Sequence, residues 1–191
     1  MGTAECNPFR VSRIEALSYR APGFSWTAFL ETLAAHAYRG AIVGPHGSGK
    51  TTLLLEARQR LEDAGVPVSY GFLNEATPSK GRAARDILAN TPRDTVLFLD
   101  GAEQIDSLTW RWLRWRSRDW RGLVITTHAP GRLPTLYRTA TSEALLRDLL
   151  GELAPDGFDQ YWERARGVHS GNQGNIRDTF FALYDDWAQS S

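Results

Sequence analysis

A run of glycines and hydroxyl-bearing residues beside one lysine has the composition of a phosphate-binding loop. Gly44-Pro45-His46-Gly47-Ser48-Gly49-Lys50-Thr51 satisfies the pattern G-x-x-x-x-G-K-[ST]. Glycines let the backbone approach an anion closely, with its N–H groups pointing inward. The lysine ammonium of this pattern reaches the β- and γ-phosphates, and the following hydroxyl binds Mg²⁺. We expect the nucleotide to be ATP, although no motif in the sequence identifies the base. The residues expected to bind it are Gly44, Pro45, His46, Gly47, Ser48, Gly49, Lys50, Thr51 and Thr52. Thr51 is also expected to bind Mg²⁺.

Two carboxylates follow an apolar run further along the chain. The segment VLFLDGAEQI ends its apolar part at Asp100, and Glu103 comes three positions later. A phosphate loop needs a carboxylate at the end of a neighbouring strand to hold Mg²⁺, so we assign Asp100 to the metal. Glu103 is predicted to be the general base that polarises the attacking water. Alternatively, Asp100 caps a turn, and Glu103 is an acidic residue of the kind favoured in the first turn of a helix.

The elements that must position these residues alternate between helix and strand. Ser25 precedes apolar residues at helical spacing, which predicts a capped helix from residue 26 to about 37. Short apolar runs predict strands at 41–44, 66–73, 95–100, 122–127 and 135–140, with helices at 50–63, 79–90 and 105–119 between them. This alternation predicts an α/β fold in which helices sandwich a parallel five-stranded sheet.

The pattern changes after Ser142, and the rest of the chain predicts only helices. Apolar side chains recur there at helical spacing in three successive segments. We therefore expect an irregular N-terminal segment (1–24), an α/β core (25–140) and a C-terminal lid of three helices (141–191).

These motifs together resemble the AAA+-type ATPases, within the phosphate-loop NTPases that use an additional catalytic glutamate. The resemblance covers most of residues 25–188 and depends on the loop at 44–51 and the strand ending in Asp100. In the AAA+ pattern the glutamate follows the aspartate directly, whereas here Gly101 and Ala102 intervene. A similarly spaced acid occurs in the STAND-type switch ATPases, which hydrolyse slowly.

The resemblance also implies two residues that contact the γ-phosphate. GLVITTH resembles the sensor-1 strand, whose polar tip orients the attacking water, which implies this role for Thr127, with Thr126 or His128 as substitutes. GNQGNIRDTFFALYD resembles the start of the third lid helix, which implies a sensor-2 role for Arg177 behind a capping Asn175. Alternatively, Thr127 is only a β-branched residue at the end of a strand, and Arg177 is only a solvated arginine.

An arginine finger and a cover over the base are further features that the resemblance implies. The finger normally lies beyond sensor 1, in the region of Arg132 and Arg138. The cover is expected from Asn7-Pro8-Phe9 and the segment up to Gly23.

The segment SLTWRWLRWRSRDWRG (107–122) predicts an amphipathic helix rich in tryptophan and arginine. At about 100° per residue, its apolar side is expected to hold Leu108, Trp112 and Trp115, extended by Leu113 and Trp120. The opposite side is expected to hold Arg111, Arg114, Arg118 and Arg121. The tryptophans are predicted to pack on the sheet, with the arginines solvated or facing a neighbouring subunit, an acidic partner or nucleic acid. Trp110 leans toward the arginines as an expected exposed anchor.

The overall composition is that of an ordinary globular protein. Basic and acidic residues number 22 each in 191, so net charge gives no reason to expect nucleic acid or a membrane as the main partner. Cys6 is the only cysteine, which excludes an intrachain disulfide and a cysteine-based metal site. The apolar runs are too short for a membrane span, and the first 30 residues lack a signal-peptide pattern. We expect a cytoplasmic protein.

The functional expectation is an Mg²⁺-dependent ATPase that couples its nucleotide state to a rearrangement of the lid or of a partner. Expected catalytic residues are Glu103, Lys50, Thr127 and Arg177. One alternative is a switch or scaffold with slow or absent turnover. Another is a nucleic-acid-associated helper of the transposition- or replication-regulator type, acting through Arg111, Arg114, Arg118 and Arg121. A protein partner or self-association is expected, and no membrane contact.

Overall fold

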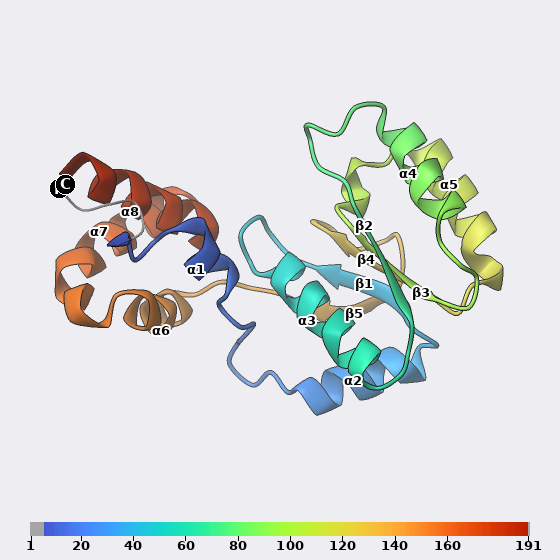
Figure 1. Cartoon of the computed structure of the whole chain (residues 1–191), viewed down its shortest axis with the longest axis horizontal. Coiled ribbons are helices and arrows are strands. Elements are labelled where there is room, and N and C mark those ends of the chain that lie inside the picture. The colour runs from blue at the N-terminus through green and yellow to red at the C-terminus, as the bar shows by residue number, and fades with distance from the viewer. Residues whose placement is uncertain (1–5, 191) are drawn as a thin grey trace. The chain divides into compact units, whose positions relative to one another are not determined.

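The computed structural model describes residues 6–190, and this part of the chain contains a five-stranded sheet (Figure 1). Its strands are β1 (Arg39–Val43), β2 (Val68–Phe72), β3 (Val96–Asp100), β4 (Gly122–Thr127) and β5 (Thr135–Arg138). Their order across the sheet is β2-β3-β4-β1-β5, and neighbouring strands run parallel. The predicted parallel five-stranded α/β sheet is confirmed.

Strands β1 and β3 lie on either side of β4, and all three end at the same edge of the sheet. Val43, at the end of β1, is opposite Thr127, at the end of β4. The backbone N–H of Gly44 continues this ladder by donating to the Thr127 carbonyl at 3.1 Å. The first residue of the phosphate-binding pattern therefore lies at the sheet edge where β3 ends in Asp100.

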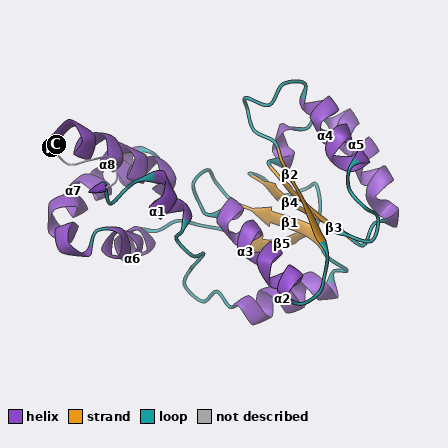
Figure 2. Ribbon diagram, viewed as in Figure 1, coloured by secondary structure: helices purple, strands orange, loops and turns teal. Residues whose placement is uncertain are grey.

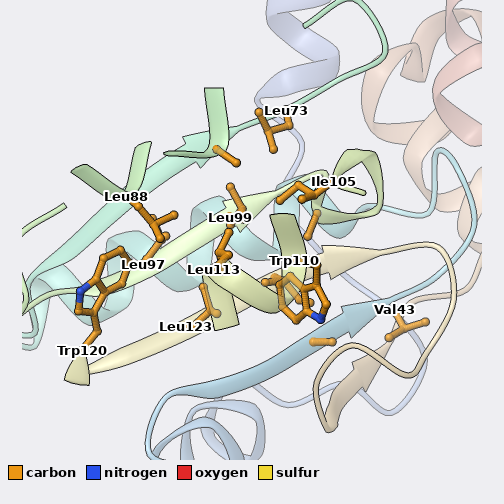
Figure 3. Packing of buried hydrophobic residues seen from close by; sticks show 14 residues of the cluster. Val43, Leu73, Leu88, Leu97, Leu99, Ile105, Trp110, Leu113, Trp120 and Leu123 are labelled. Atoms are coloured by element: carbon orange, nitrogen blue, oxygen red, sulfur yellow. The ribbon is translucent and has the colours of Figure 1, made fainter. Parts of the chain in front are cut away.

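Helices α4 (Lys80–Ala89) and α5 (Ser107–Arg116) cover one face of the sheet. Side chains alternate between the two faces of a strand, so the odd-numbered positions of β1, β3 and β4 share this face. With the helices they form one buried cluster, which includes Val43, Leu97, Leu99, Leu123, Leu88, Trp110 and Leu113 (Figure 3). Each buried side chain of this size contributes about 1.5–3 kcal/mol, so the cluster fixes the strands that carry the polar residues at the sheet edge.

Helices α2 (Trp26–Ala35) and α3 (Lys50–Asp63) lie on the opposite face (Figure 2). Ser25 caps α2 as predicted, with its hydroxyl accepting from the Ala28 N–H at 3.4 Å. The helix ends at Ala35, slightly before the predicted end, because Ala37 and Tyr38 turn the chain with φ of 51° and 55°. Short 3-10 turns occupy Ala102–Gln104, Ser117–Asp119 and Pro155–Gly157.

The prediction of which side of α5 is buried is wrong for Leu108 and Trp115, although Leu113 and Trp120, predicted to extend the same side, are buried. Trp110 and Leu113 lie in the core at 8% and 0% exposure, whereas Leu108 and Trp115 are 77% and 61% exposed. The helix carries apolar residues on two sides, so its periodicity alone does not choose between them. Trp110 and Leu113 belong to the buried cluster that also contains Trp120. Trp110 is therefore a core residue and not the exposed anchor that the sequence predicted.

The C-terminal helices are α6 (Glu143–Leu153), α7 (Phe158–Gly171) and α8 (Ile176–Ser190), in agreement with the predicted three. Their shared core contains Leu146, Leu150 and Phe180, and it includes Phe9 from the N-terminal segment. That segment, predicted to be irregular, contains the five-residue helix α1 (Val11–Glu15). Residues 1–5 of the predicted segment 1–24 lie outside the described residues.

The chain divides into two compact units. One comprises Gly23–Gly44 and Leu53–Arg138, with the whole sheet. The other comprises the described residues up to Pro22, the segment Pro45–Thr52 and the chain from Thr139 onward. The phosphate loop thus groups with the C-terminal helices, and the predicted boundaries after residues 24 and 140 stay predictions. In the described part of the chain, no helix has both the length and the apolar character needed to cross a bilayer.

Candidate nucleotide site

At two positions of the loop between β1 and α3, the backbone has a conformation that only glycine adopts without strain. Gly47 and Gly49 have φ of +65° and +83°, in the left-handed region. A Cβ at Gly47 would lie 1.8 Å from Asn175 Oδ1, and one at Gly49 would lie 3.1 Å from the ring of Tyr19. Helix α3 begins at Lys50, so the loop leads directly into a helix N-terminus, which favours an anion.

Two side chains of the loop converge on the carbonyl oxygen of Pro45. Lys50 Nζ donates to it at 2.7 Å, and the Ser48 hydroxyl donates at 2.8 Å. The Ser48 hydroxyl also lies 2.6 Å from the Thr139 hydroxyl. Lys50 and Ser48 are 9% and 4% exposed. The ammonium group is therefore held against the backbone of its own loop instead of extending into solvent.

The other predicted loop residues differ in exposure. Gly44 is buried, His46 is exposed, and Thr51 and Thr52 are half-buried in the first turn of α3. The hydroxyl assigned to Mg²⁺ thus belongs to the helix that follows the loop.

Helix α8 begins beside the loop, within the same compact unit. Asn175 Oδ1 accepts from the Asp178 N–H at 3.1 Å, which confirms Asn175 as the N-cap of α8. The same oxygen occupies the space where a side chain at position 47 would be. Arg177 is exposed, with its guanidinium 5.6 Å from the centre of the Phe181 ring. The sensor-2 role of Arg177 stays a prediction.

The N-terminal segment contributes to the surroundings of the loop through Tyr19. Phe9, which was expected to cover the base, is fully buried among the C-terminal helices, with its ring 4.9 Å from that of Tyr161 and 6.2 Å from that of Phe180. Asn7 donates from Nδ2 to the Tyr184 carbonyl at 3.2 Å. Asn7 and Phe9 thus stabilise the helical core.

In the sheet-containing unit, Asp100 lies at the centre of a buried polar cluster. Its side chain is 3% exposed, and Oδ1 accepts from the Thr126 hydroxyl at 2.5 Å. The same hydroxyl accepts from the backbone N–H of Gly101 at 2.8 Å. The Tyr70 hydroxyl donates to Oδ2 at 3.3 Å, and burial together with the Asp100 charge raises the pKa of Tyr70 above its ordinary value. The carboxylate is therefore fixed in orientation by neutral donors.

The alternation of side chains along β4 separates Thr126 from Thr127. Even-numbered positions of β3 and β4 share a face, so Thr126 lies beside Asp100. Thr127 belongs to the other face, and its hydroxyl donates to the Ala129 carbonyl at 2.8 Å. A role for Thr127 in contacting phosphate stays a prediction, while the hydrogen bonds identify Thr126 as the partner of the candidate metal ligand.

Glu103 is held by one of its two carboxylate oxygens. Oε1 lies 2.8 Å from His128 Nε2. Oε2 is buried and accepts no hydrogen bond from the described residues. Burial lowers the pKa of Arg132 below its ordinary value, and the negative charge of Glu103 opposes this shift. Its guanidinium donates to the Ile105 carbonyl at 2.5 Å, so in the described structure Arg132 is engaged within its own unit.

The two residues predicted to bind the metal, Asp100 and Thr51, carry oxygen donors of the kind that Mg²⁺ prefers. Among the described residues, no group of three or more histidine, cysteine or acidic side chains could hold a metal ion. Mg²⁺ prefers hard oxygen ligands, and it is typically bound by one or two carboxylates together with substrate phosphates. Asp100 and Thr51 offer a carboxylate and a hydroxyl oxygen of this kind. They belong to different compact units.

Sequence reasoning missed Tyr70 and Tyr19. Tyr70 lies on β2, next to β3, and its role depends on the register that pairs Tyr70 with Phe98. Tyr19 lies far from the loop in sequence, in a segment without helical or strand periodicity. Neither tyrosine belongs to a motif, so only the folded chain reveals these contacts.

No protein-family model and no curated protein matches the chain. Its fold is similar to solved structures of RuvB from Thermotoga maritima. The Holliday junction branch migration motor has a TM-score of 0.45 and 15% identity, with 83% of this chain and 67% of that chain covered. Two single-substitution variants of RuvB have TM-scores of 0.47 and 0.43 at 14% identity, with 84% of this chain and 69% of each covered. This likeness is one of fold. The chain itself has a parallel α/β sheet with the strand–G-x-x-x-x-G-K-T–helix unit of phosphate-loop proteins.

Proposed function

We propose that the protein is an Mg²⁺-dependent ATPase of AAA+-like type. The observation that carries the proposal is the strand–loop–helix unit, in which Gly47 and Gly49 adopt left-handed backbones and Lys50 opens α3. This is the local geometry that presents N–H groups and a helix N-terminus to phosphate oxygens. The buried Asp100, oriented by Thr126, supports a metal-binding carboxylate on the strand parallel to β1.

In the proposed reaction the loop N–H groups and the Lys50 ammonium bind the β- and γ-phosphates of ATP. Lys50 exchanges its hydrogen bond to the Pro45 carbonyl for phosphate oxygens, which are stronger acceptors because they are charged. Thr51 and Asp100 are the residues that would hold Mg²⁺, and the ion would neutralise charge on the phosphates. The residues of this chain thus orient the γ-phosphate for attack by water.

Glu103 is the proposed general base. His128 contacts Oε1, and Oε2 has no hydrogen-bond partner among the described residues, so we assign to Oε2 the role of accepting the proton of the attacking water. Because Oε2 is buried, this role requires the site to open enough to admit that water. In this arrangement His128 is a positioning residue, since it acts on the carboxylate and not on the substrate. Exchange of nucleotide at the loop would be sensed by α8, because Asn175 both caps this helix and contacts the space at Gly47.

The second candidate is a nucleotide-dependent switch or scaffold with slow or absent turnover. It is favoured by the two residues, Gly101 and Ala102, that separate Asp100 from Glu103. A nucleic-acid helper of the regulator type remains the third candidate and depends on the exposed arginines of α5.

The variant Glu103→Gln separates turnover from binding. General-base catalysis contributes about 10²–10⁴-fold, so the ATPase should lose turnover by that factor while its affinity for ATP, measured by calorimetry, stays the same. Glu75→Gln, at an exposed carboxylate, is the matched control and should leave both quantities unchanged. Turnover that is equally slow in the wild type and in Glu103→Gln would favour the switch.

The variant His128→Ala tests the positioning role. We expect a fall in kcat of about tenfold with little change in KM, and recovery in His128→Gln, which restores a donor to Oε1. A kcat unaffected by His128→Ala would remove His128 from the mechanism.

A further inference from the structure

The outer side of α5 presents large apolar side chains to solvent. Leu108 and Trp115 are 77% and 61% exposed, the highest values among the large hydrophobic residues of the described chain. Trp112 lies between them and is half-buried. These three residues have the spacing i, i+4, i+7, so they form one stripe along the helix. We call Leu108, Trp112 and Trp115 the outer stripe of α5.

The outer stripe is bordered by positive charge. Exposed arginines follow it along the helix and just beyond: Arg111, Arg114, Arg116, Arg118 and Arg121. Within the described chain, none of these five forms an ion pair, and Asp119 is the only carboxylate between residues 107 and 121. On the side of α4, the Arg85 guanidinium lies 5.6 Å from the centre of the Trp112 ring. The surface is therefore apolar along its middle and cationic at its borders.

We propose that the outer stripe of α5 and its arginines bind an amphipathic helix of a partner protein, with an apolar seam and glutamate or aspartate on both flanks. The spacing i, i+4, i+7 is that of the anchors used when one helix packs along another. Tryptophan and arginine are the residue types that contribute most at protein interfaces. Charge complementarity selects acidic flanks, because unpaired arginines border the stripe. This inference is independent of the ATPase proposal.

The apolar groups favour a protein over nucleic acid. A phosphate backbone is bound by cations, and exposed aromatic rings stack on single-stranded bases. Leu108 fits neither mode, yet it is the most exposed large apolar residue of the described chain. An aliphatic residue in register with two tryptophans instead matches the seam of a helix pair.

The test uses the full chain and a synthetic peptide of about 21 residues, three heptads long, with leucine at the seam and glutamate on both flanks. Binding is measured by fluorescence anisotropy of the labelled peptide. We expect saturable binding that weakens at least about tenfold in Leu108→Ser/Trp115→Ser. The matched control is Val11→Ser, which removes an apolar side chain that is 48% exposed on α1. Leu108, Trp115 and Val11 are all exposed, so neither the double variant nor the control should change the midpoint of unfolding.

A second peptide, with lysine in place of each glutamate, isolates the charge contribution. We expect it not to bind. The proposal is overturned if the acidic peptide does not bind, if both peptides bind equally, or if the double variant binds as the wild type does.

Two further arms address other occupants of the surface. The first arm measures binding of a labelled duplex of about 20 base pairs in low salt. The surface is a nucleic-acid site if the duplex binds, if the acidic peptide does not compete with it, and if the triple variant Arg111→Ala/Arg114→Ala/Arg118→Ala no longer binds it. If the wild type self-associates in solution and Leu108→Ser/Trp115→Ser is monomeric, the occupant is a second copy of the chain. Either result would overturn the proposed partner.

Discussion

Replacing Thr126 by valine should destabilise the protein much more than the same replacement at Thr127. Valine keeps the branched shape of threonine but lacks its hydroxyl. The Thr126 hydroxyl bonds Asp100 Oδ1 at 2.5 Å and the Gly101 N–H at 2.8 Å, and all three residues are buried. A hydrogen bond to a charged group contributes about 1.5–3 kcal/mol, and a buried N–H without a partner costs about 1–3 kcal/mol. Allowing for partial relaxation, we expect a loss of about 2–4 kcal/mol.

Urea denaturation of the two variants measures this difference, with the m value as a check that the same surface is exposed on unfolding. The Thr127 hydroxyl bonds the carbonyl of Ala129, an exposed residue, so water replaces it at a cost of about 0.5–1.5 kcal/mol. At about 2–4 °C per kcal/mol, Thr126→Val should lower Tm by about 5–15 °C. Equal losses in the two variants, or a loss below about 1 kcal/mol in Thr126→Val, would refute the assignment of Thr126 as the partner of Asp100.

Three further predictions follow from buried contacts. Gly47→Ala should weaken ATP binding measured by calorimetry, since its Cβ would lie 1.8 Å from Asn175 Oδ1 at a φ of +65°; unchanged affinity would mean that the loop and α8 are not in contact. Trp110→Ala should lower the free energy of unfolding, measured by urea denaturation, by about 3–5 kcal/mol, and Trp115→Ala should lower it by less than about 0.5 kcal/mol. A larger loss in Trp115→Ala than in Trp110→Ala would mean that Trp115 is buried and Trp110 exposed, as the sequence predicted. The pKa of Tyr70 is raised on folding, so its contribution to stability is present below pH about 10 and is lost at higher pH. Tyr70→Phe should therefore reduce the decrease in unfolding free energy that the wild type shows at alkaline pH. A decrease identical to that of the wild type would refute the raised pKa.

The sequence was sufficient for the sheet and the loop because both are encoded locally. The apolar run before Asp100 and the strand–glycine–lysine order at 43–51 need no knowledge of distant contacts. The caps Ser25 and Asn175 were predictable for the same reason, since a cap acts within a few residues of itself.

Features that depend on strand register were beyond the sequence. The assignment of Thr126 rather than Thr127 to Asp100 requires knowing which positions of β3 and β4 share a face. The position of Glu103 opposite His128 likewise depends on two turns that follow different strands.

Helix α5 shows a different limit. Apolar residues lie on two of its sides, so a helical wheel gives two acceptable buried faces. In the folded chain Trp110 and Leu113 pack in the same buried cluster as the sheet residues Leu97 and Leu123. The other side, with Leu108, Trp115 and the neighbouring arginines, is exposed. This is the side that we propose as a docking surface.

The central claim is that the loop beginning at Gly44 binds nucleotide phosphates through Lys50. Calorimetric titration of the wild type with ATP in the presence of Mg²⁺ tests it directly, with Lys50→Ala as the variant and Lys80→Ala, at the one other lysine of the sequence, as the control. We predict that the wild type and Lys80→Ala bind alike and that Lys50→Ala binds about 10–100-fold more weakly, the loss expected for a charge-assisted contact. Absence of ATP binding in the wild type, or equal affinity in Lys50→Ala, would contradict the claim.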